Sequence, residues 1–129
     1  MKTHQYTIMV SADDIDALHH VNNVRYVQWV QDAAEAHWKS LATDTMKKQY
    51  LWVVLSHHIE YKGQAFLGDK VLVKTFVSRS KGVTSTRVVE MYHEEKGHLL
   101  VKAETNWCLL DAQSKRPTRM NDELISLFE

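Results

Sequence analysis

The chain has 129 residues, 44% of them apolar, and its 16 basic and 16 acidic residues give a formal net charge of zero. This size and composition predict a single domain, residues 1–129, with a core of its own. A neutral chain lacks the clustered positive charge that nucleic acids require, and no apolar run approaches the roughly 18–20 residues of a membrane span, so we expect neither partner.

The first elements in chain order are a strand, a polar loop and a long helix. Residues 1–6 hold no apolar signal-peptide region, residues 5–11 predict a strand, and residues 12–22 predict a loop. Residues 24–41 have the periodicity of a helix, with Asn22 or Asn23 as N-cap. Its polar stripe is narrow and consists of Arg25, Gln28, Asp32, Glu35 and Lys39. A helix this apolar should be wrapped largely by other structure.

The rest of the chain predicts four long antiparallel strands and a short final helix. The strands are residues 50–62, 70–79, 83–93 and 99–109, with hairpin turns at Lys81-Gly82 and Lys96-Gly97, and Asn121 caps a helix over residues 122–128. A helix of about 27 Å and strands of about 34 Å match in length. The simplest packing is an α+β layer arrangement, with a five-stranded antiparallel sheet curved around the long helix.

Cys108 is the only cysteine, so the chain forms no intrachain disulfide, and we expect a cytoplasmic protein. Cys108 lies in the middle of a predicted strand, where we interpret it as a small packing residue rather than a nucleophile. No Gly-x-Ser-x-Gly elbow is present. His57 and His58 point to opposite faces of a strand, and His19 and His20 have no partner at zinc-site spacing, so we expect no metal site.

The segment 14–26 combines carboxylates, imidazoles and amides directly before the long helix. A helix start offers unpaired backbone N–H groups and a partial positive charge, which can stabilise a carbonyl oxygen that becomes negative in a transition state. Asp16 is the candidate reactive carboxylate, either attacking a carbonyl directly or deprotonating a water molecule. Asp13 is interpreted as a solvated residue, and Asp14 as a brace for the loop.

Several short motifs resemble the hot-dog-fold thioesterases similar to the 4-hydroxybenzoyl-CoA thioesterase family, which act on acyl-CoA or acyl-carrier-protein thioesters. They are Asp16, His20-Val21-Asn22-Asn23, Tyr26, Glu60-Tyr61, Phe66-Leu67-Gly68-Asp69, Arg116-Pro117 and Asn121-Asp122-Glu123-Leu124. The resemblance implies a hot-dog fold, thioester hydrolysis without a cofactor, and active sites at the interface of a homodimer or homotetramer. It places the catalytic aspartate at Asp16 and the backbone N–H that polarises the carbonyl at Asn23.

The chain mixes features of two branches of that family. His20, Asn22 and Asn23 resemble the acyl-carrier-protein branch, whereas Leu18 and Gln64 stand where that branch commonly has Asn and Glu. His20 is a candidate for orienting the substrate, and Asn22, Tyr26 and Gln64 are candidates for contacting it. The remaining candidates are cations that could meet phosphates, namely Arg79 and Lys81 at a hairpin tip, with Lys62 and Arg87.

The leading functional hypothesis is an acyl-CoA thioesterase. The alternatives are an acyl-carrier-protein thioesterase with the same chemistry, a non-catalytic module that binds acyl-CoA, and a hydratase or dehydratase on the same fold. A pure binding module would gain nothing from a carboxylate beside the thioester, which favours an enzyme. The exposed outer face and edges of one sheet around one helix, together with the tryptophans 29, 38, 52 and 107, predict at least a dimer.

Overall fold

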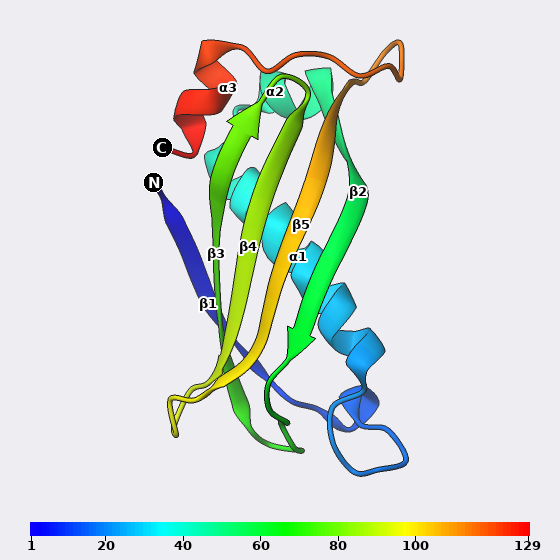
Figure 1. The fold of residues 1–129 in the computed structure, drawn as a ribbon, viewed down its shortest axis with the longest axis vertical. Coiled ribbons are helices and arrows are strands. Elements are labelled where there is room, and N and C mark those ends of the chain that lie inside the picture. Colours follow the sequence, from blue (N-terminus) through cyan, green and yellow to red (C-terminus); the bar gives the residue numbers. More distant parts are fainter.

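The computed structural model describes residues 1–129, in which one antiparallel sheet curves around one long helix (Figure 1). The expected α+β architecture is thereby confirmed. The elements are β1 (Thr3–Met9), a 3-10 turn (Ala12–Asp14), α1 (Asn23–Leu41), α2 (Asp44–Gln49), β2 (Tyr50–Tyr61), β3 (Lys70–Lys81), β4 (Thr84–His93), β5 (Leu99–Asp111) and α3 (Asp122–Leu127).

The order of strands in the sheet is β1-β3-β4-β5-β2, and every neighbouring pair is antiparallel. β3, β4 and β5 follow one another through tight hairpins, where Gly82 and Gly97 adopt the positive φ angles of +64° and +79° that their turns require. β2 and β3 follow one another in the chain but are not neighbours, because β2 pairs with β5 at the far edge. The strands are therefore antiparallel as expected, but they do not form a simple meander.

Alternating side chains of the strands face the helix. On β5, Val101, Ala103 and Thr105 are buried while Lys102 and Glu104 are exposed, as the period of two in the sequence predicts. The same alternation on β3 and β4 builds an apolar core in the half of the sheet that lies under the first turns of α1. This core holds the start of the helix at one end of the sheet.

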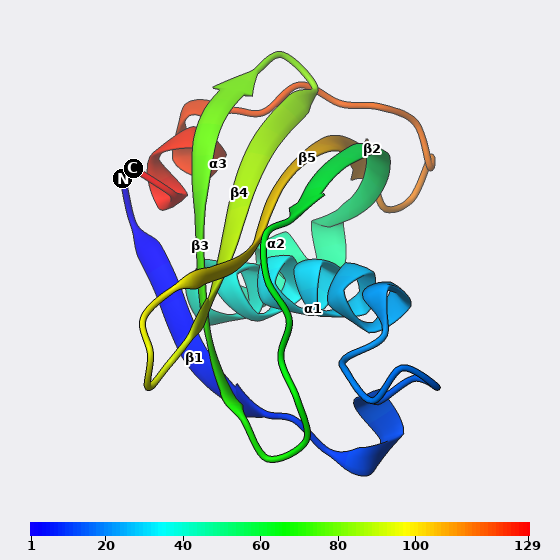
Figure 2. The same ribbon diagram turned by 60° about the horizontal axis from the view of Figure 1, so that its bottom comes forward.

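The helix α1 lies across the concave side of the sheet (Figure 2) and buries one face against it. Tyr26, Trp29, Val30 and Ala33 are at most 6% exposed. Burying one such large side chain stabilises the fold by roughly 1.5–3 kcal/mol. The expectation that the helix would be largely wrapped is wrong for this chain. Its outer face is open, and Val24 on that face is 73% exposed.

The short helix α2 was not predicted, because its six residues carry no apolar periodicity. Its start is nevertheless marked by Thr43, whose hydroxyl accepts a hydrogen bond from the Met46 N–H at 3.1 Å. Met46 packs with Leu109 and Leu124 in a second small core, which closes the end of the sheet opposite the start of α1. None of the helices combines the length and apolarity needed to cross a bilayer.

A polar cluster interrupts the core beneath the last turns of α1. Arg87 of β4 is 5% exposed, and its Nη1 donates hydrogen bonds to His37 Nδ1 at 2.9 Å and Thr75 Oγ1 at 3.1 Å. Burial, reinforced by the neighbouring Arg87 charge, lowers the pKa of His37 to about 4. His37 is therefore neutral at pH 7, with Nδ1 as the acceptor. Cys108 is buried within β5, as the interpretation of a packing residue requires.

The depressed pKa of His37 should make stability depend on pH. The unfolded chain takes up a proton at His37 near pH 6.5, whereas the folded chain does so only near pH 4. The free energy of unfolding should therefore fall as the pH is lowered through this window, by about 3 kcal/mol in total. Urea unfolding of the wild type and of His37→Gln, whose amide still accepts from Arg87, measures the effect. Equal pH slopes in the two proteins would contradict it.

Candidate active site

The loop that precedes α1 brings Asp16 and His20 together. Asp16 and His20 close a short hairpin, in which the Asp16 N–H donates to the His20 carbonyl at 3.0 Å and the His19 N–H donates to the Asp16 carbonyl at 3.1 Å. His19 takes the left-handed position of the turn, with φ of +68°. On either side of this hairpin, Ile15 and Val21 form an antiparallel bridge. The side chain at position 16 is thus presented from a compact, internally bonded loop.

Asp14 fastens this loop to the first turn of α1. One oxygen of its carboxylate lies 2.8 Å from Arg25 Nε, and the other accepts from the Ser11 N–H at 2.9 Å and the Ser11 hydroxyl at 3.2 Å. Its carbonyl accepts from the Asn22 N–H at 2.9 Å. The side chain is largely buried, as its predicted role of a brace requires, whereas Asp13 is exposed.

A second loop, between β2 and β3, holds the other side of the site. The Val21 N–H donates to the Ala65 carbonyl at 2.9 Å, and the Ala65 N–H donates to the Tyr26 hydroxyl at 3.2 Å. Tyr26 is 2% exposed, and burial raises the pKa of its phenol, so it acts as a neutral anchor between the helix and this loop. Gln64 precedes Ala65 and is exposed beside it. Ala65 could not be predicted from the sequence, because a backbone contact leaves no side-chain signature.

The start of α1 leaves one backbone N–H without a partner. Asn22 is the N-cap, and its Oδ1 accepts from the Val24 N–H at 3.0 Å. Asn23 is the first helical residue, and its N–H donates no hydrogen bond within the chain. A free N–H at the positive end of a helix favours an anionic or polarised oxygen. The expected cap is confirmed as Asn22, which leaves the Asn23 N–H available.

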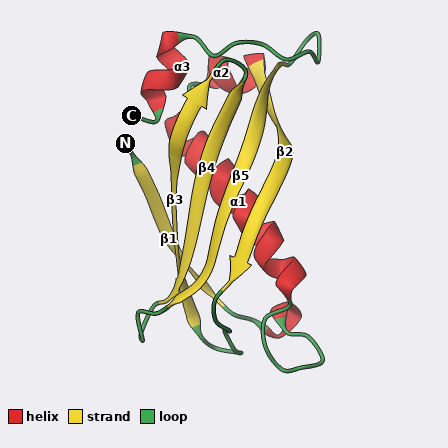
Figure 3. Cartoon of the chain, in the orientation of Figure 1, coloured by secondary structure: helices red, strands yellow, loops and turns green.

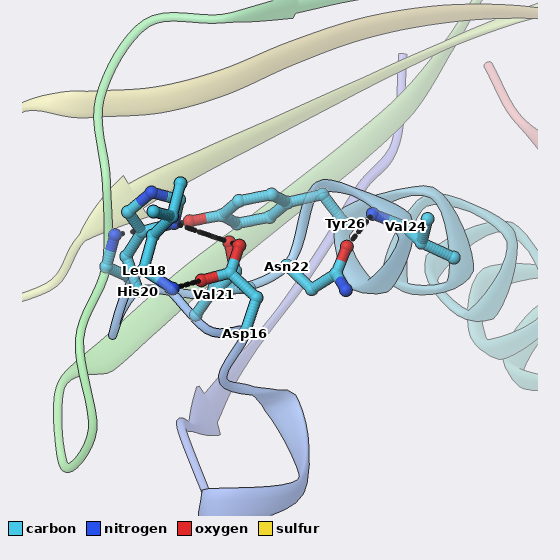
Figure 4. A network of polar contacts seen from close by, with 8 residues as sticks. Asp16, Leu18, His20, Val21, Asn22, Val24 and Tyr26 are labelled. Atoms are coloured by element: carbon cyan, nitrogen blue, oxygen red, sulfur yellow. Dashed lines mark hydrogen bonds and ion pairs between the residues drawn. The ribbon is translucent and has the colours of Figure 1, made fainter.

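Asp16, His20 and the cap lie close together in front of this helix start (Figure 4). Asp16 Oδ1 accepts from the Leu18 N–H at 2.9 Å, and Oδ2 lies 3.6 Å from His20 Nδ1. His20 Nδ1 is 3.2 Å from the Val21 carbonyl, which can only accept, so this nitrogen carries the proton and Nε2 is left free. The Asp16 side chain is 23% exposed, which keeps one carboxylate oxygen accessible to substrate or water.

Two predicted substrate contacts are not brought to this place. Arg79 and Lys81 lie at the β3–β4 hairpin, at the end of the sheet opposite the loops that carry Asp16 and Gln64 (Figure 3). Both are exposed. Arg87 was a candidate for meeting phosphates, but its side chain is buried in the polar cluster with His37 and is not presented to a phosphate at the surface.

Comparisons with known proteins identify the family of the chain. A family model described as the thioesterase-like superfamily matches residues 10–128. The long-chain acyl-CoA thioesterase FadM of Escherichia coli K12 is 23% identical over 130 residues, covering 97% of this chain and 96% of that protein. The chain therefore belongs to the thioesterase-like superfamily, and this membership identifies it as a thioester hydrolase.

Solved structures establish the hot-dog fold that the sequence predicts. A predicted thioesterase from Bacillus stearothermophilus superposes with a TM-score of 0.87 at 19% identity, covering 98% of this chain and 94% of that one. A 1,4-dihydroxy-2-naphthoyl-CoA thioesterase from Synechocystis superposes with a TM-score of 0.83 at 18% identity, covering 98% and 96%. At these identities the likeness concerns the fold alone.

Removal of the Asp14 carboxylate should loosen the loop that carries Asp16. Asp14→Ala leaves Arg25 Nε and the Ser11 donors without their acceptor, so the free energy of unfolding should fall by about 2 kcal/mol. Hydrogen exchange at the Asn22 amide should become faster. The matched control is Asp13→Ala, which should change stability by less than about 0.5 kcal/mol. A similar small change in both variants would contradict the bracing role.

Proposed function

We propose that this thioester hydrolase cleaves acyl-CoA, with the Asp16 carboxylate as nucleophile or general base and the Asn23 N–H as oxyanion donor. The observation that carries the proposal is a partly accessible carboxylate in the loop directly before a capped helix start, whose first N–H has no partner within the chain. A cysteine nucleophile has no such support, since the only cysteine is buried in β5. A serine nucleophile has none either, since the sequence contains no Gly-x-Ser-x-Gly elbow. The likeness to an acyl-CoA thioesterase supports CoA as the carrier.

The proposed chemistry follows from the geometry of the two groups. When Asp16 acts as nucleophile, its oxygen bonds to the thioester carbonyl carbon, the C–S bond breaks, thiolate leaves, and water hydrolyses the resulting anhydride. When Asp16 acts as general base, it takes a proton from a water molecule whose oxygen forms that bond instead. In both routes the carbonyl oxygen becomes negative and accepts from the Asn23 N–H. One such donor typically lowers a barrier by roughly 3–4 kcal/mol.

The remaining site residues are assigned by their positions. His20 orients the Asp16 carboxylate through Nδ1 and the substrate through Nε2, and Asn22 fixes the helix start as its cap. Gln64 contacts the substrate from the neighbouring loop, while the buried Tyr26 positions that loop and contributes little surface of its own. Arg79 and Lys81 are too far along the sheet to serve the same Asp16, so they meet CoA phosphates only if a second subunit supplies them.

That requirement fits a proposed dimer with active sites between subunits. β2 is an edge strand with unpaired backbone groups, and its exposed face carries Leu51, Val53 and Leu55, the last 57% exposed. Long apolar edge strands left bare promote association with another chain. A homodimer or homotetramer built on this edge would cover the apolar row.

Replacement of Asp16 by Asn should abolish most of the activity. The amide keeps the oxygen that accepts from Leu18 but is neither a nucleophile nor a base, so kcat should fall by a factor of about 10² or more. Release of free thiol from short, long and aromatic acyl-CoAs by wild type and variant measures the loss and fixes the preferred acyl group. Asp13→Asn, an exposed acid in the same loop, should retain activity.

Two other outcomes would change the proposal. Equal activity of the wild type and Asp16→Asn would mean that another group performs the chemistry. Binding of acyl-CoA by the wild type without any hydrolysis would favour an acyl-carrier-protein substrate or a binding module. Assays with acyl-carrier-protein thioesters then separate those two alternatives.

The oligomeric state should be at least dimeric. Light scattering at micromolar concentration should give at least twice the 15.0 kDa mass of the chain. Leu55→Asp on β2 should shift the protein toward monomer, because it places a charge in the apolar row. Met9→Asp on the other edge strand, β1, is the matched control for an exposed apolar residue. A monomeric wild type, or dissociation caused only by Met9→Asp, would overturn this assignment.

A further inference from the structure

A cavity of about 380 Å³ lies between the second half of α1, α2 and the adjoining ends of β2, β4 and β5. Its volume falls in the range of small-molecule sites, roughly 300–1,000 Å³. Trp38, Trp52 and Trp107 contribute apolar wall, and the first two are held edge to face with ring centroids 5.8 Å apart. The cavity is therefore lined by large aromatic surfaces that pack together within this chain.

The guanidinium of Arg87 lines this cavity without an anionic partner. Arg87 is 5% exposed, yet no carboxylate lies within ion-pair distance of it. Its two hydrogen bonds, to His37 and Thr75, both use Nη1, so Nε and Nη2 donate nothing within the chain. Burial lowers its pKa only to about 10, which leaves it charged at neutral pH. The guanidinium carbon lies 5.4 Å from the centroid of the Phe128 ring, a cation–π contact, but this ring supplies no counter-charge and no hydrogen-bond acceptor for Nε and Nη2.

Trp107, which lines the same cavity, carries a second donor without a partner. Trp107 Nε1 is buried and has no hydrogen-bond partner, an uncommon state for an indole N–H in a protein core. Trp107 stands opposite Ser85 on β4, two residues before Arg87 on the same face of that strand. The indole and the guanidinium are therefore near neighbours. Both are donors, so what they lack is an acceptor.

The rim of the cavity argues for a small negative charge on the occupant. Glu35 and Lys39 of α1 form an ion pair of 2.7 Å, and Asp32 and Lys47 also line the opening, so the rim is balanced. A polyphosphate would find no positive field there. A carboxylate has two acceptor oxygens and one charge, which matches the fork of a guanidinium in the bidentate arrangement.

We propose that this cavity binds a carboxylate carried on an aromatic or aliphatic body, with the carboxylate on Arg87 and Trp107 and the body against the tryptophans. The proposal goes beyond thioester hydrolysis at Asp16, and only the acyl source named next rests on that proposed function. The carboxylate has two possible sources, a free carboxylic acid or the far end of an acyl group. An acyl group could reach this cavity from the helix start, because Gln28 and Gln31 line both the cavity and a hollow of about 410 Å³ that extends to Asn22.

Calorimetric titration with 4-phenylbutyrate, compared with the neutral alcohol 4-phenylbutan-1-ol, tests the site. The acid should bind the wild type at least tenfold more tightly than the alcohol and should change its tryptophan fluorescence. Arg87→Met should remove this preference, and Trp107→Phe, which deletes one donor, should weaken the acid several-fold. The matched control is Arg119→Met at an exposed arginine, which should change nothing.

The proposal fails if neither compound binds, if acid and alcohol bind equally, or if Arg87→Met keeps the preference. If Arg87→Met does not fold, the acid-to-alcohol ratio in wild type and Trp107→Phe still decides, because equal ratios would exclude a donor role for the indole. The source of the carboxylate is then identified by displacement experiments on Asp16→Asn, which should leave the thioester uncleaved. Displacement of bound acid by an ω-carboxyacyl-CoA, but not by a neutral acyl-CoA of equal length, assigns the acyl group. Lack of displacement by both assigns a free acid.

Discussion

The burial of one face of α1 against the concave side of the sheet is the constraint on which the rest of the structure depends. The apolar contacts of Tyr26, Trp29, Val30 and Ala33 fix the axis of the helix relative to the strands. Because that core is concentrated under the first turns, the N-terminus of α1 is held rigidly at one end of the sheet. A rigid helix start is what a reaction needs if it uses a backbone N–H as an electrostatic donor, since such donors act only when already oriented.

Two short loops then determine what faces that helix start. The loop before α1 is tied to the helix through Asp14 and Arg25, and the loop after β2 is tied to both through Ala65. These contacts are largely backbone and charge-assisted hydrogen bonds, which tolerate little displacement of Asp16 or Asn23. The reactive groups are thus placed by residues that take no part in the proposed chemistry. These supporting contacts explain how so polar a loop can hold one conformation at the surface.

The sequence predicts those parts of the fold whose signals are local. The period of two on β5, the glycines at 82 and 97 and the amide before α1 each report a strand, a turn or a cap directly. The pairing of β2 with β5 could not be predicted from the sequence, because it depends on contacts between segments far apart in the chain. The burial of Arg87 also depends on such long-range strand pairing, so the sequence did not reveal it. The candidate site was predicted from Asp16 and the amide cap, whereas Ala65 acts through its backbone and leaves no signal in the sequence.

The concave face of the sheet changes from apolar to polar along α1, and this change bears on which ligands the fold can bind. Beneath the first turns it is apolar, as a core must be, whereas beneath the last turns it contains Arg87, His37 and Thr75. Apolar residues of similar volume would often stabilise the same space as well or better. Arg87 bonds His37 and Thr75 and contacts the Phe128 ring, but none of these partners carries a negative charge. An acceptor from outside the chain would supply that charge, as in the carboxylate site proposed for the adjoining cavity.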